Sequence, residues 1–242
     1  MQLAALWVVA TLGAQYALAA DPTFSFVDAR NIDLSRLLAP PPSDSSEVTR
    51  AELDAMLMIQ QRRSPAQAAL ALADNQIALE RFSEAVGSAK SLKDVPLPLT
   101  TALTSKVQRD VSPVISAGKE AFNRPRPYAL ERQLKPVVPL PGGASHPSGH
   151  VVWAYVTGLV LADMVPERRL QILARADEFS RNRVIAGVHY PSDVESGRMT
   201  ATIFTAFLFA SPGFESERAA AAKELRAALG LPHLPPRAAP KT

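Results

Sequence analysis

Two stretches of the chain, residues 151–164 and 199–210, are apolar on nearly every side at helical spacing. A helix of that kind is buried. Each stretch is shorter than the roughly 20 residues that a helix needs to cross a bilayer. We therefore expect two apolar helices at the centre of the fold and no stable insertion into a membrane.

Capping signals predict further helices on both sides of this centre. Thr49-x-x-Glu52 and Ser64-Pro65-x-Gln67 resemble N-terminal capping boxes, the second with proline at the first helical position. The predicted helices cover about 50–62, 65–86 with an end at Gly87, a short segment from Ser112-Pro113 to before Pro125, a segment from Pro166, and an amphipathic segment of about 216–230. No convincing alternation of a strand is present, so the pattern predicts an all-α, single-domain helical bundle around two buried apolar helices.

The ends of the chain differ from this helical middle. Residues 1–20 carry no charged side chain and end in Ala-Leu-Ala-Ala, which predicts a signal peptide cleaved near residue 19–20 and a periplasmic or secreted protein. A buried N-terminal helix is the alternative. Residues 21–46 are rich in Pro, Ser and Asp and predict an extended lead-in, 47–230 form the predicted helical domain, and 231–242 a disordered tail.

Composition narrows the classes of function. The 242 residues include 26 basic and 23 acidic side chains without a Lys/Arg block, so polymeric nucleic acid is not expected as a partner, whereas small anionic substrates fit. The absence of cysteine excludes disulfides, thiolate chemistry and Cys-based zinc sites. No Cys, His and carboxylate cluster with metal-ligand spacing is evident, and we expect neither a metal nor a cofactor.

The tetrapeptide Pro147-Ser148-Gly149-His150 directly precedes the first buried stretch. Ser148 is placed to cap that helix, Gly149 lets a ligand approach the backbone, and a helix N-terminus readily binds an anion. Taken alone, the motif is equally compatible with a plain helix cap and a surface histidine.

Two basic residues and a His–Asp pair add candidate chemistry. Lys119 lies on the short predicted helix, and Arg126 lies between two prolines that fix its backbone for contact with oxyanions. Arg183 closes a helix, and His189 precedes Asp193 by four positions. A carboxylate there can accept a hydrogen bond from one imidazole nitrogen and leave the other free to attack. Taken alone, Lys119 and Arg126 are most often part of a solvated helix face, and His189 with Asp193 favours a core histidine whose hydrogen bond a nearby aspartate satisfies.

As a set, the motifs K-x6-RP, PSGH and R-x5-H-x3-D resemble the signature of the type 2 phosphatidic acid phosphatase (PAP2) superfamily, and especially its bacterial class A non-specific acid phosphatases. The segments LLAPPPSDSS, QQRRSPAQAALALADN and GVHYPSDVESGRM extend the resemblance over roughly residues 30–210. The resemblance implies an all-helical fold and metal-independent hydrolysis of small phosphomonoesters, such as nucleotides, sugar phosphates and aryl phosphates, at acidic pH.

The resemblance also implies a role for each motif residue. His189 attacks phosphorus, Asp193 orients it, and His150 protonates the leaving oxygen and then activates water. The groups implied to hold the phosphate oxygens are Lys119, Arg126, Ser148, the Gly149 amide and Arg183. The family usually has serine where this chain has Asn182. His146 is expected at the pocket rim, and His233 needs no function.

Two alternatives stay open beside the exported acid phosphatase. Vanadium-dependent haloperoxidases resemble the same motifs but are usually much longer chains, and a phosphate-binding protein without turnover would not need both histidines and the aspartate. The lack of several long apolar spans disfavours an integral lipid phosphatase. The sequence does not decide the leaving group, the physiological role, whether phosphotransfer competes with hydrolysis, or whether the chain forms a homo-oligomer.

Overall fold

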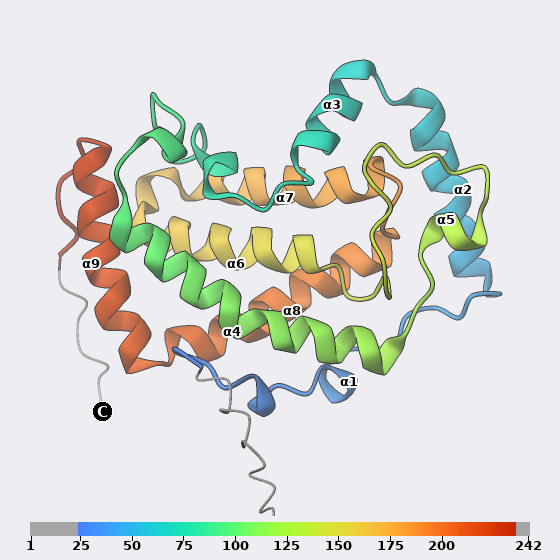
Figure 1. Cartoon of the computed structure of the whole chain (residues 1–242), viewed down its shortest axis with the longest axis horizontal. Helices are drawn as coiled ribbons and strands as arrows, with labels where there is room; N and C mark the ends of the chain where they lie inside the picture. Colours follow the sequence, from blue (N-terminus) through green and yellow to red (C-terminus); the bar gives the residue numbers. More distant parts are fainter. Residues whose placement is uncertain (1–23, 236–242) are drawn as a thin grey trace, which may run out of the picture.

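The computed structural model describes residues 24–235, and every regular element in that part of the chain is a helix (Figure 1). The α-helices are α1 Leu34–Leu37, α2 Glu47–Arg62, α3 Pro65–Ala73, α4 Pro98–Phe122, α5 Pro127–Leu130, α6 Gly149–Met164, α7 Arg169–Ile185, α8 Pro191–Phe209 and α9 Pro212–Ala228. The 3-10 helices are η1 Ala29–Asn31, η2 Leu79–Phe82, η3 Leu92–Asp94 and η4 Pro166–Arg168. The predicted all-α bundle is confirmed. The predicted signal peptide and residues 236–242 of the predicted tail lie outside the described residues.

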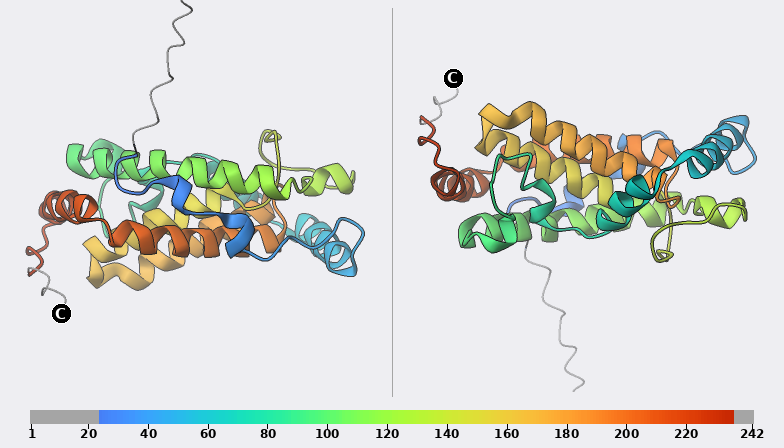
Figure 2. Two further views of the ribbon diagram at one scale, coloured as in Figure 1. Left: turned by 90° about the horizontal axis from the view of Figure 1, so that it is seen from below. Right: turned by 90° about the horizontal axis from the view of Figure 1, so that it is seen from above.

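Helix α6 is the centre of the bundle. Eleven of its 16 residues are buried, and it lies between α7 on one side and α4 on the other when the molecule is seen from above (Figure 2). Helix α8 packs along α6 as well. The prediction that residues 199–210 form a second fully buried helix is wrong in part: one side of α8 faces the core, whereas Met199 and Phe207 on its other side are each 43% exposed.

Two glycines let the central helices approach closely. A Cβ atom at Gly158 of α6 would lie 3.1 Å from the Cβ of Ala176 on α7. At Gly197 of α8, a Cβ atom would lie 2.8 Å from the Cβ of Val151 and 2.9 Å from the carbonyl oxygen of Ser148. This close contact brings the first turns of α8 beside the N-terminus of α6, where the sequence motifs meet.

The predicted helix over residues 65–86 is wrong in its extent, because α3 ends at Ala73. The next residue, Asp74, is fully buried and binds Arg81 and Arg175, so the chain turns into the protein at that point. The predicted capping box at Ser64 is confirmed.

Helix starts also differ from the prediction at α2 and α4. The Ser46 side chain, three residues before Thr49, caps α2. Helix α4 starts at Pro98, not at Ser112, and contains Pro113 in its interior. It ends at Phe122 and is capped by Asn123, which has φ +42°, before the two prolines that were expected to stop it.

The lead-in is not simply extended, since it contains η1 and α1. The fully buried carboxylate of Asp110 on α4 accepts backbone hydrogen bonds from Ser25, Phe26 and Val27 at 2.7–3.0 Å. This carboxylate therefore holds the lead-in against the bundle.

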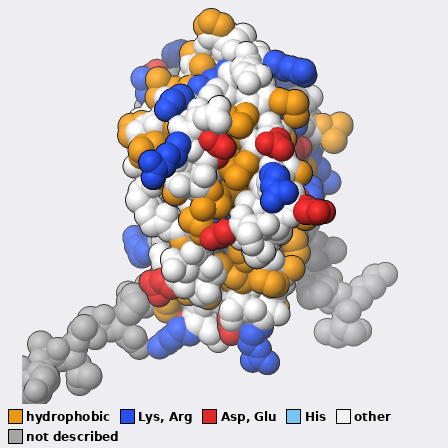
Figure 3. Space-filling view, turned by 90° about the vertical axis from the view of Figure 1, so that its right-hand side faces the viewer, with side chains coloured by type: hydrophobic (Ala, Val, Ile, Leu, Met, Phe, Trp, Pro, Cys, Tyr) orange, Lys and Arg blue, Asp and Glu red, His pale blue; other side chains and the backbone are white. Residues whose placement is uncertain are grey.

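The end of the molecule formed by α2 and α5 shows apolar side chains among charged ones (Figure 3). Val48 and Met58 of α2 are 56% and 50% exposed. That the chain forms a homo-oligomer stays a prediction. Within residues 24–235, no helix combines the length and apolarity needed to cross a membrane.

Candidate active site

The predicted site residues converge at the N-terminal end of α6, the right-hand end of the bundle in Figure 1. Helix α4 ends there, α7 ends there and α8 begins there. The convergence is direct: the Ser148 amide donates to the Asp193 carbonyl oxygen at 3.2 Å, and Arg126 Nη1 lies 2.9 Å from His189 Nε2. The eight residues lie on α4 (Lys119), before α5 (Arg126), at the start of α6 (Ser148, Gly149, His150), in the last turn of α7 (Arg183) and around the start of α8 (His189, Asp193).

The ring of His189 is buried, and each of its two nitrogens faces a charged side chain. Its Nδ1 lies 3.4 Å from Asp193 Oδ2, and its Nε2 faces the Arg126 guanidinium. Because a guanidinium only donates, Nε2 carries the lone pair and Nδ1 carries the proton. Burial lowers the pKa of His189 to about 3; Asp193 opposes this and Arg126 adds to it. The ring is therefore neutral over most of the pH range, with an unprotonated Nε2.

Asp193 is the most heavily bonded side chain of the site. Its Oδ2 accepts the Ser145 hydroxyl and the Tyr190 amide, the latter at 3.0 Å. Burial would raise its pKa, but hydrogen bonds from His146 and His189 outweigh burial and hold the pKa well below the usual value. The carboxylate is thus ionised and fixed beside His189.

Arg124 supports this carboxylate, and the sequence analysis missed it. Its Nη1 donates to Asp193 Oδ1 at 2.8 Å, its Nη2 donates to Glu52 Oε2 at 3.0 Å, and its guanidinium lies 3.7 Å from the centre of the Tyr190 ring. The run Asn-Arg-Pro-Arg-Pro, in which Arg124 and Arg126 both precede a proline, was the available signal.

The prediction that His146 lies at the pocket rim is wrong, because the residue is only 1% exposed. Its Nδ1 lies 3.3 Å from Asp193 Oδ1, and its ring packs against Phe122 in a T-shaped arrangement with centroids 4.8 Å apart. The residue belongs to the packing around Asp193.

His150 lies half-buried on the first turn of α6, and its Nε2 is 3.1 Å from the Asn75 carbonyl oxygen. Burial lowers its pKa to about 4, and the positive charge of Arg183 contributes to the decrease. An anion bound beside it would act in the opposite direction and favour the protonated ring.

Three cations near the two histidines have no carboxylate partner in the part of the chain that the structure describes. Lys119 Nζ donates to the Ala144 carbonyl at 2.7 Å, and Arg126 Nε donates to the Gly143 carbonyl at 3.2 Å. Within residues 24–235, no Asp or Glu oxygen lies within 4.0 Å of the side-chain nitrogens of Lys119, Arg126 or Arg183. Such a cluster favours an anion.

The burial of these cations and their closeness to one another lower their pKa values. Burial, followed by repulsion from Arg126, lowers the pKa of Lys119 to about 8 and that of Arg183 to about 10. Lys119 lies in the last turn of the 25-residue helix α4, not on a short helix as predicted.

Ser148 occupies the N-cap position of α6, but its side chain makes no capping hydrogen bond, contrary to the prediction. Its hydroxyl oxygen is buried and has no hydrogen-bond partner among the described residues. The first amides of a helix lack partners within the helix, so this hydroxyl and the Gly149 amide are donors available to a bound anion.

Asn182 bonds to a residue outside this cluster. Its Nδ2 donates to Asp74 Oδ2 at 2.7 Å, and the side chain is 3% exposed. It ties α7 to the end of α3.

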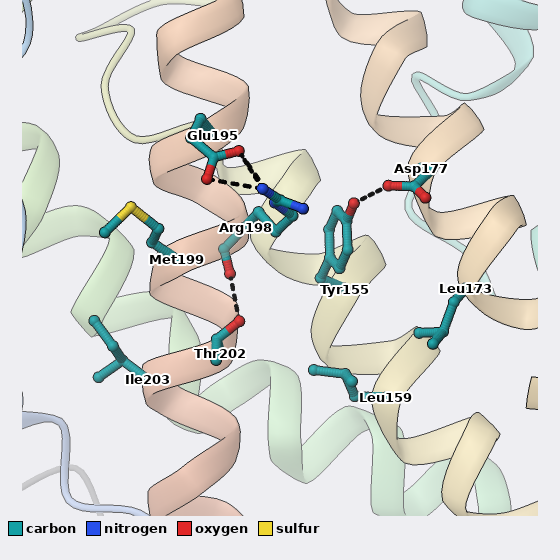
Figure 4. Close-up of a pocket in the computed structure, with 9 residues that line it drawn as sticks. All are labelled: Tyr155, Leu159, Leu173, Asp177, Glu195, Arg198, Met199, Thr202 and Ile203. Carbon is teal, nitrogen blue, oxygen red and sulfur yellow. Dashed lines mark hydrogen bonds and ion pairs between the residues drawn. The ribbon is translucent and has the colours of Figure 1, made fainter.

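A groove of about 530 Å³ between α6, α7 and α8 contrasts with this cluster (Figure 4). Its polar side chains bind one another: the Tyr155 hydroxyl donates to Asp177, and Arg198 donates to Glu195. The groove therefore offers no comparable set of available donors. Among residues 24–235, no group of three or more His, Cys, Asp and Glu side chains could hold a metal ion.

The sequence profile of the PAP2 superfamily matches residues 97–216, which contain all eight predicted site residues. A non-specific acid phosphatase of Providencia stuartii is 31% identical over 199 residues, which cover 78% of this chain and 79% of that protein. The chain belongs to the PAP2 superfamily. An acid phosphatase of Zymomonas mobilis is 28% identical, with 82% of this chain and 77% of that protein covered. A non-specific acid phosphatase of Salmonella typhi is 29% identical, with 78% of each covered.

Solved structures share the PAP2 fold at lower identity. A bacterial vanadium-dependent iodoperoxidase superposes with a TM-score of 0.58 and 17% identity, covering 72% of this chain and 52% of that one. A transmembrane PAP2-type phosphatidylglycerolphosphate phosphatase from Bacillus subtilis superposes with a TM-score of 0.51 and 17% identity, covering 72% and 89%. At this identity, the likeness concerns the fold alone.

Proposed function

We propose that the protein is an exported acid phosphatase that hydrolyses small phosphomonoesters through a phosphohistidine at His189. The family and the relatives named acid phosphatases support the phosphatase activity. The observation that carries the mechanism is the contact of His189 Nε2 with Arg126 at 2.9 Å, inside a cluster of cations that have no carboxylate partner among residues 24–235.

The first step forms a P–N bond and breaks the P–O ester bond. The phosphate oxygens take the donors of Arg126, which releases Nε2 of His189 to attack phosphorus. The ring keeps its Nδ1 proton, and the Asp193 carboxylate, which faces Nδ1, stabilises the positive charge that develops on the ring. Protonated His150 gives its proton to the leaving oxygen, so the alcohol departs neutral.

The second step reverses these roles. Neutral His150 takes a proton from water, the water oxygen bonds to phosphorus, and the P–N bond breaks. Inorganic phosphate leaves, and His189 is again neutral with an unprotonated Nε2.

The three non-bridging oxygens need positive charge throughout. Lys119, Arg126 and Arg183 supply it, and the Ser148 hydroxyl and the Gly149 amide add donors at the helix N-terminus. Fixed donors aimed at the phosphoryl group stabilise the transition state without reorganisation.

This proposal implies acid-favoured turnover. His150 must be protonated for the first step, and burial depresses its pKa to about 4 in the free site. The bound dianion raises that pKa, so activity rises as the pH falls toward the pKa of the occupied site.

The testing experiment is hydrolysis of aryl, sugar and nucleotide monoesters by the wild type and His189→Ala, with and without a chelator. We expect turnover that survives chelation and is lost in His189→Ala. Activity that disappears with a chelator and returns with a divalent metal would overturn the mechanism, as would full activity of His189→Ala.

Export and the haloperoxidase alternative need separate measurements. N-terminal sequencing of the protein from its native host is expected to start near residue 20 or 21, and an intact Met1 in a cytosolic fraction would refute export. Oxidation of bromide at an enzymatic rate by the vanadate-loaded protein would favour the haloperoxidase.

A further inference from the structure

One residue outside the predicted site contacts two of its members. Asn75 lies in the turn after α3, half-buried. Its carbonyl oxygen is 3.1 Å from His150 Nε2, and its side-chain Oδ1 accepts a hydrogen bond from Arg183 Nη2 at 3.3 Å. It therefore joins the first turn of α6 to the last turn of α7.

The carbonyl contact determines which nitrogen of His150 exchanges protons. A carbonyl only accepts, so Nε2 keeps its proton whether the ring is neutral or charged. The proton that the ring gains and loses is then on Nδ1. His189 has the opposite arrangement, since its Nδ1 faces a carboxylate and its Nε2 faces a donor.

The side-chain contact holds Arg183 and leaves most of its donors available. Nη2 is bonded to Asn75, whereas Nε and Nη1 are buried and have no partner in the part of the chain that the structure describes. Asn75 thus fixes the guanidinium on one side while two nitrogens remain for an anion.

The turn that carries Asn75 is held from outside the reaction centre. The neighbouring Asp74 is fully buried, and its carboxylate binds Arg81, Arg175 and Asn182. Arg175 and Asn182 are both on α7, so the turn and α7 form one rigid support. The backbone amide of Asn75 donates to the Leu72 carbonyl oxygen at 3.0 Å, which fixes the backbone of Asn75.

We propose that Asn75 is a positioning residue that sets the His150 tautomer through its carbonyl and orients Arg183 through its side chain. This inference rests on the proposed function, in which His150 is the acid–base group and Arg183 binds phosphate. It assigns the two effects to different atoms of one residue, so they are separable by experiment.

The side-chain effect is tested with Asn75→Ala and, as the matched control, Gln76→Ala, because Gln76 is adjacent and exposed. We expect Asn75→Ala to raise KM and the inhibition constant of inorganic phosphate about tenfold, the size of effect that loss of one hydrogen bond to a charged group produces. The ratio of kcat for aryl and alkyl phosphates stays unchanged, because the carbonyl is retained. Asn75→Gln, which keeps an amide oxygen, is expected to recover part of the affinity.

The carbonyl effect is read in the wild-type protein, which does not depend on the folding of a variant. In ¹⁵N spectra of histidine-labelled protein above the pKa of His150, His150 is expected as the Nε2–H tautomer and His189 as the Nδ1–H tautomer. Assignment uses His150→Gln and His189→Gln.

Two outcomes would overturn the inference: an Nδ1–H tautomer of His150, or an Asn75→Ala enzyme with the constants of Gln76→Ala. The proposed function fails separately, if His189→Ala retains turnover. An inactive His189→Ala beside an unaffected Asn75→Ala would therefore refute only the role of Asn75.

Discussion

Arginines are buried at both ends of α6, but Arg183 at the N-terminal end lacks, within residues 24–235, the carboxylate partner that Arg218 and Arg226 have at the C-terminal end. At the C-terminal end, Arg226 is 1% exposed and donates to Glu167 at 2.6 Å, while Arg218 is 4% exposed and donates to Asp163 at 2.7 Å. At the N-terminal end of α6, Arg183 is fully buried, and the only hydrogen-bond partner of its guanidinium within residues 24–235 is the neutral side chain of Asn75.

The pKa values record the same difference. Hydrogen bonds to Glu167 raise the pKa of Arg226 above its usual value, whereas burial lowers that of Arg183 to about 10. A buried charge without a partner destabilises a fold. The unpaired charge of Arg183 at the N-terminal end of α6 therefore indicates a binding site, in which a ligand supplies the opposite charge. The paired arginines at the C-terminal end stabilise the fold.

The largest expected effect is on catalysis by Arg183→Met. Removing a donor aimed at the phosphoryl group should lower kcat/KM about 10³-fold. The free energy of unfolding in phosphate-free buffer should stay equal or rise, because an unpaired buried charge is replaced by an apolar side chain of similar length. Steady-state kinetics and denaturant unfolding measure the two quantities. An Arg183→Met variant that loses stability but retains kcat/KM would contradict the assignment of Arg183 to ligand binding.

Inorganic phosphate should stabilise the protein only by binding at the N-terminal end of α6. At 100 times its Kd, a ligand of the folded state raises the free energy of unfolding by about 2.7 kcal/mol. We expect this increase in the wild type and in Arg226→Met but not in Arg183→Met, measured by thermal unfolding with increasing phosphate. Equal stabilisation of all three proteins would place the phosphate elsewhere.

Arg226→Met should have the converse effect of Arg183→Met. It loses bonds to Glu167 and to the carbonyl oxygens of Met164 and Pro232, which should lower the free energy of unfolding by about 2 kcal/mol. The kcat of the folded enzyme should not change. A drop in kcat without a change in stability would contradict the assignment of this end to the fold.

A further prediction concerns the pH dependence of the free energy of unfolding without phosphate. The pKa values of His150 and His189 fall from 6.5 to about 4 and about 3 on folding. Between pH 6.5 and those values, the unfolded chain binds more protons, so stability falls as the pH is lowered through this window. His150→Gln should lose less stability there than the wild type, as measured by urea unfolding at several pH values. An identical loss in both proteins would show that the His150 pKa is not depressed.

The sequence predicted the central helix because an apolar stretch is a local signal, whereas it predicted the site through the resemblance of the three motifs, taken together, to the PAP2 signature. Residues 151–164 are apolar all round, and the motifs directly flank predicted helix ends. The break after Ala73 was missed because it depends on the burial of Asp74 with Arg175, 101 positions away. Long-range contacts of this kind also concealed Asn75, Arg124 and the buried position of His146, none of which has a local signature strong enough to identify its partner.

The most direct test of the account is to locate the phosphoryl group during turnover. His150→Ala should slow both steps, since general acid–base assistance is typically worth about 10²–10⁴ in rate. With p-nitrophenyl phosphate, whose leaving group departs as a stable anion, the second step should become limiting and the phosphoenzyme should accumulate. Mass spectrometry of the variant quenched at alkaline pH is predicted to find phosphate on His189. Phosphate on any other residue would contradict the central claim.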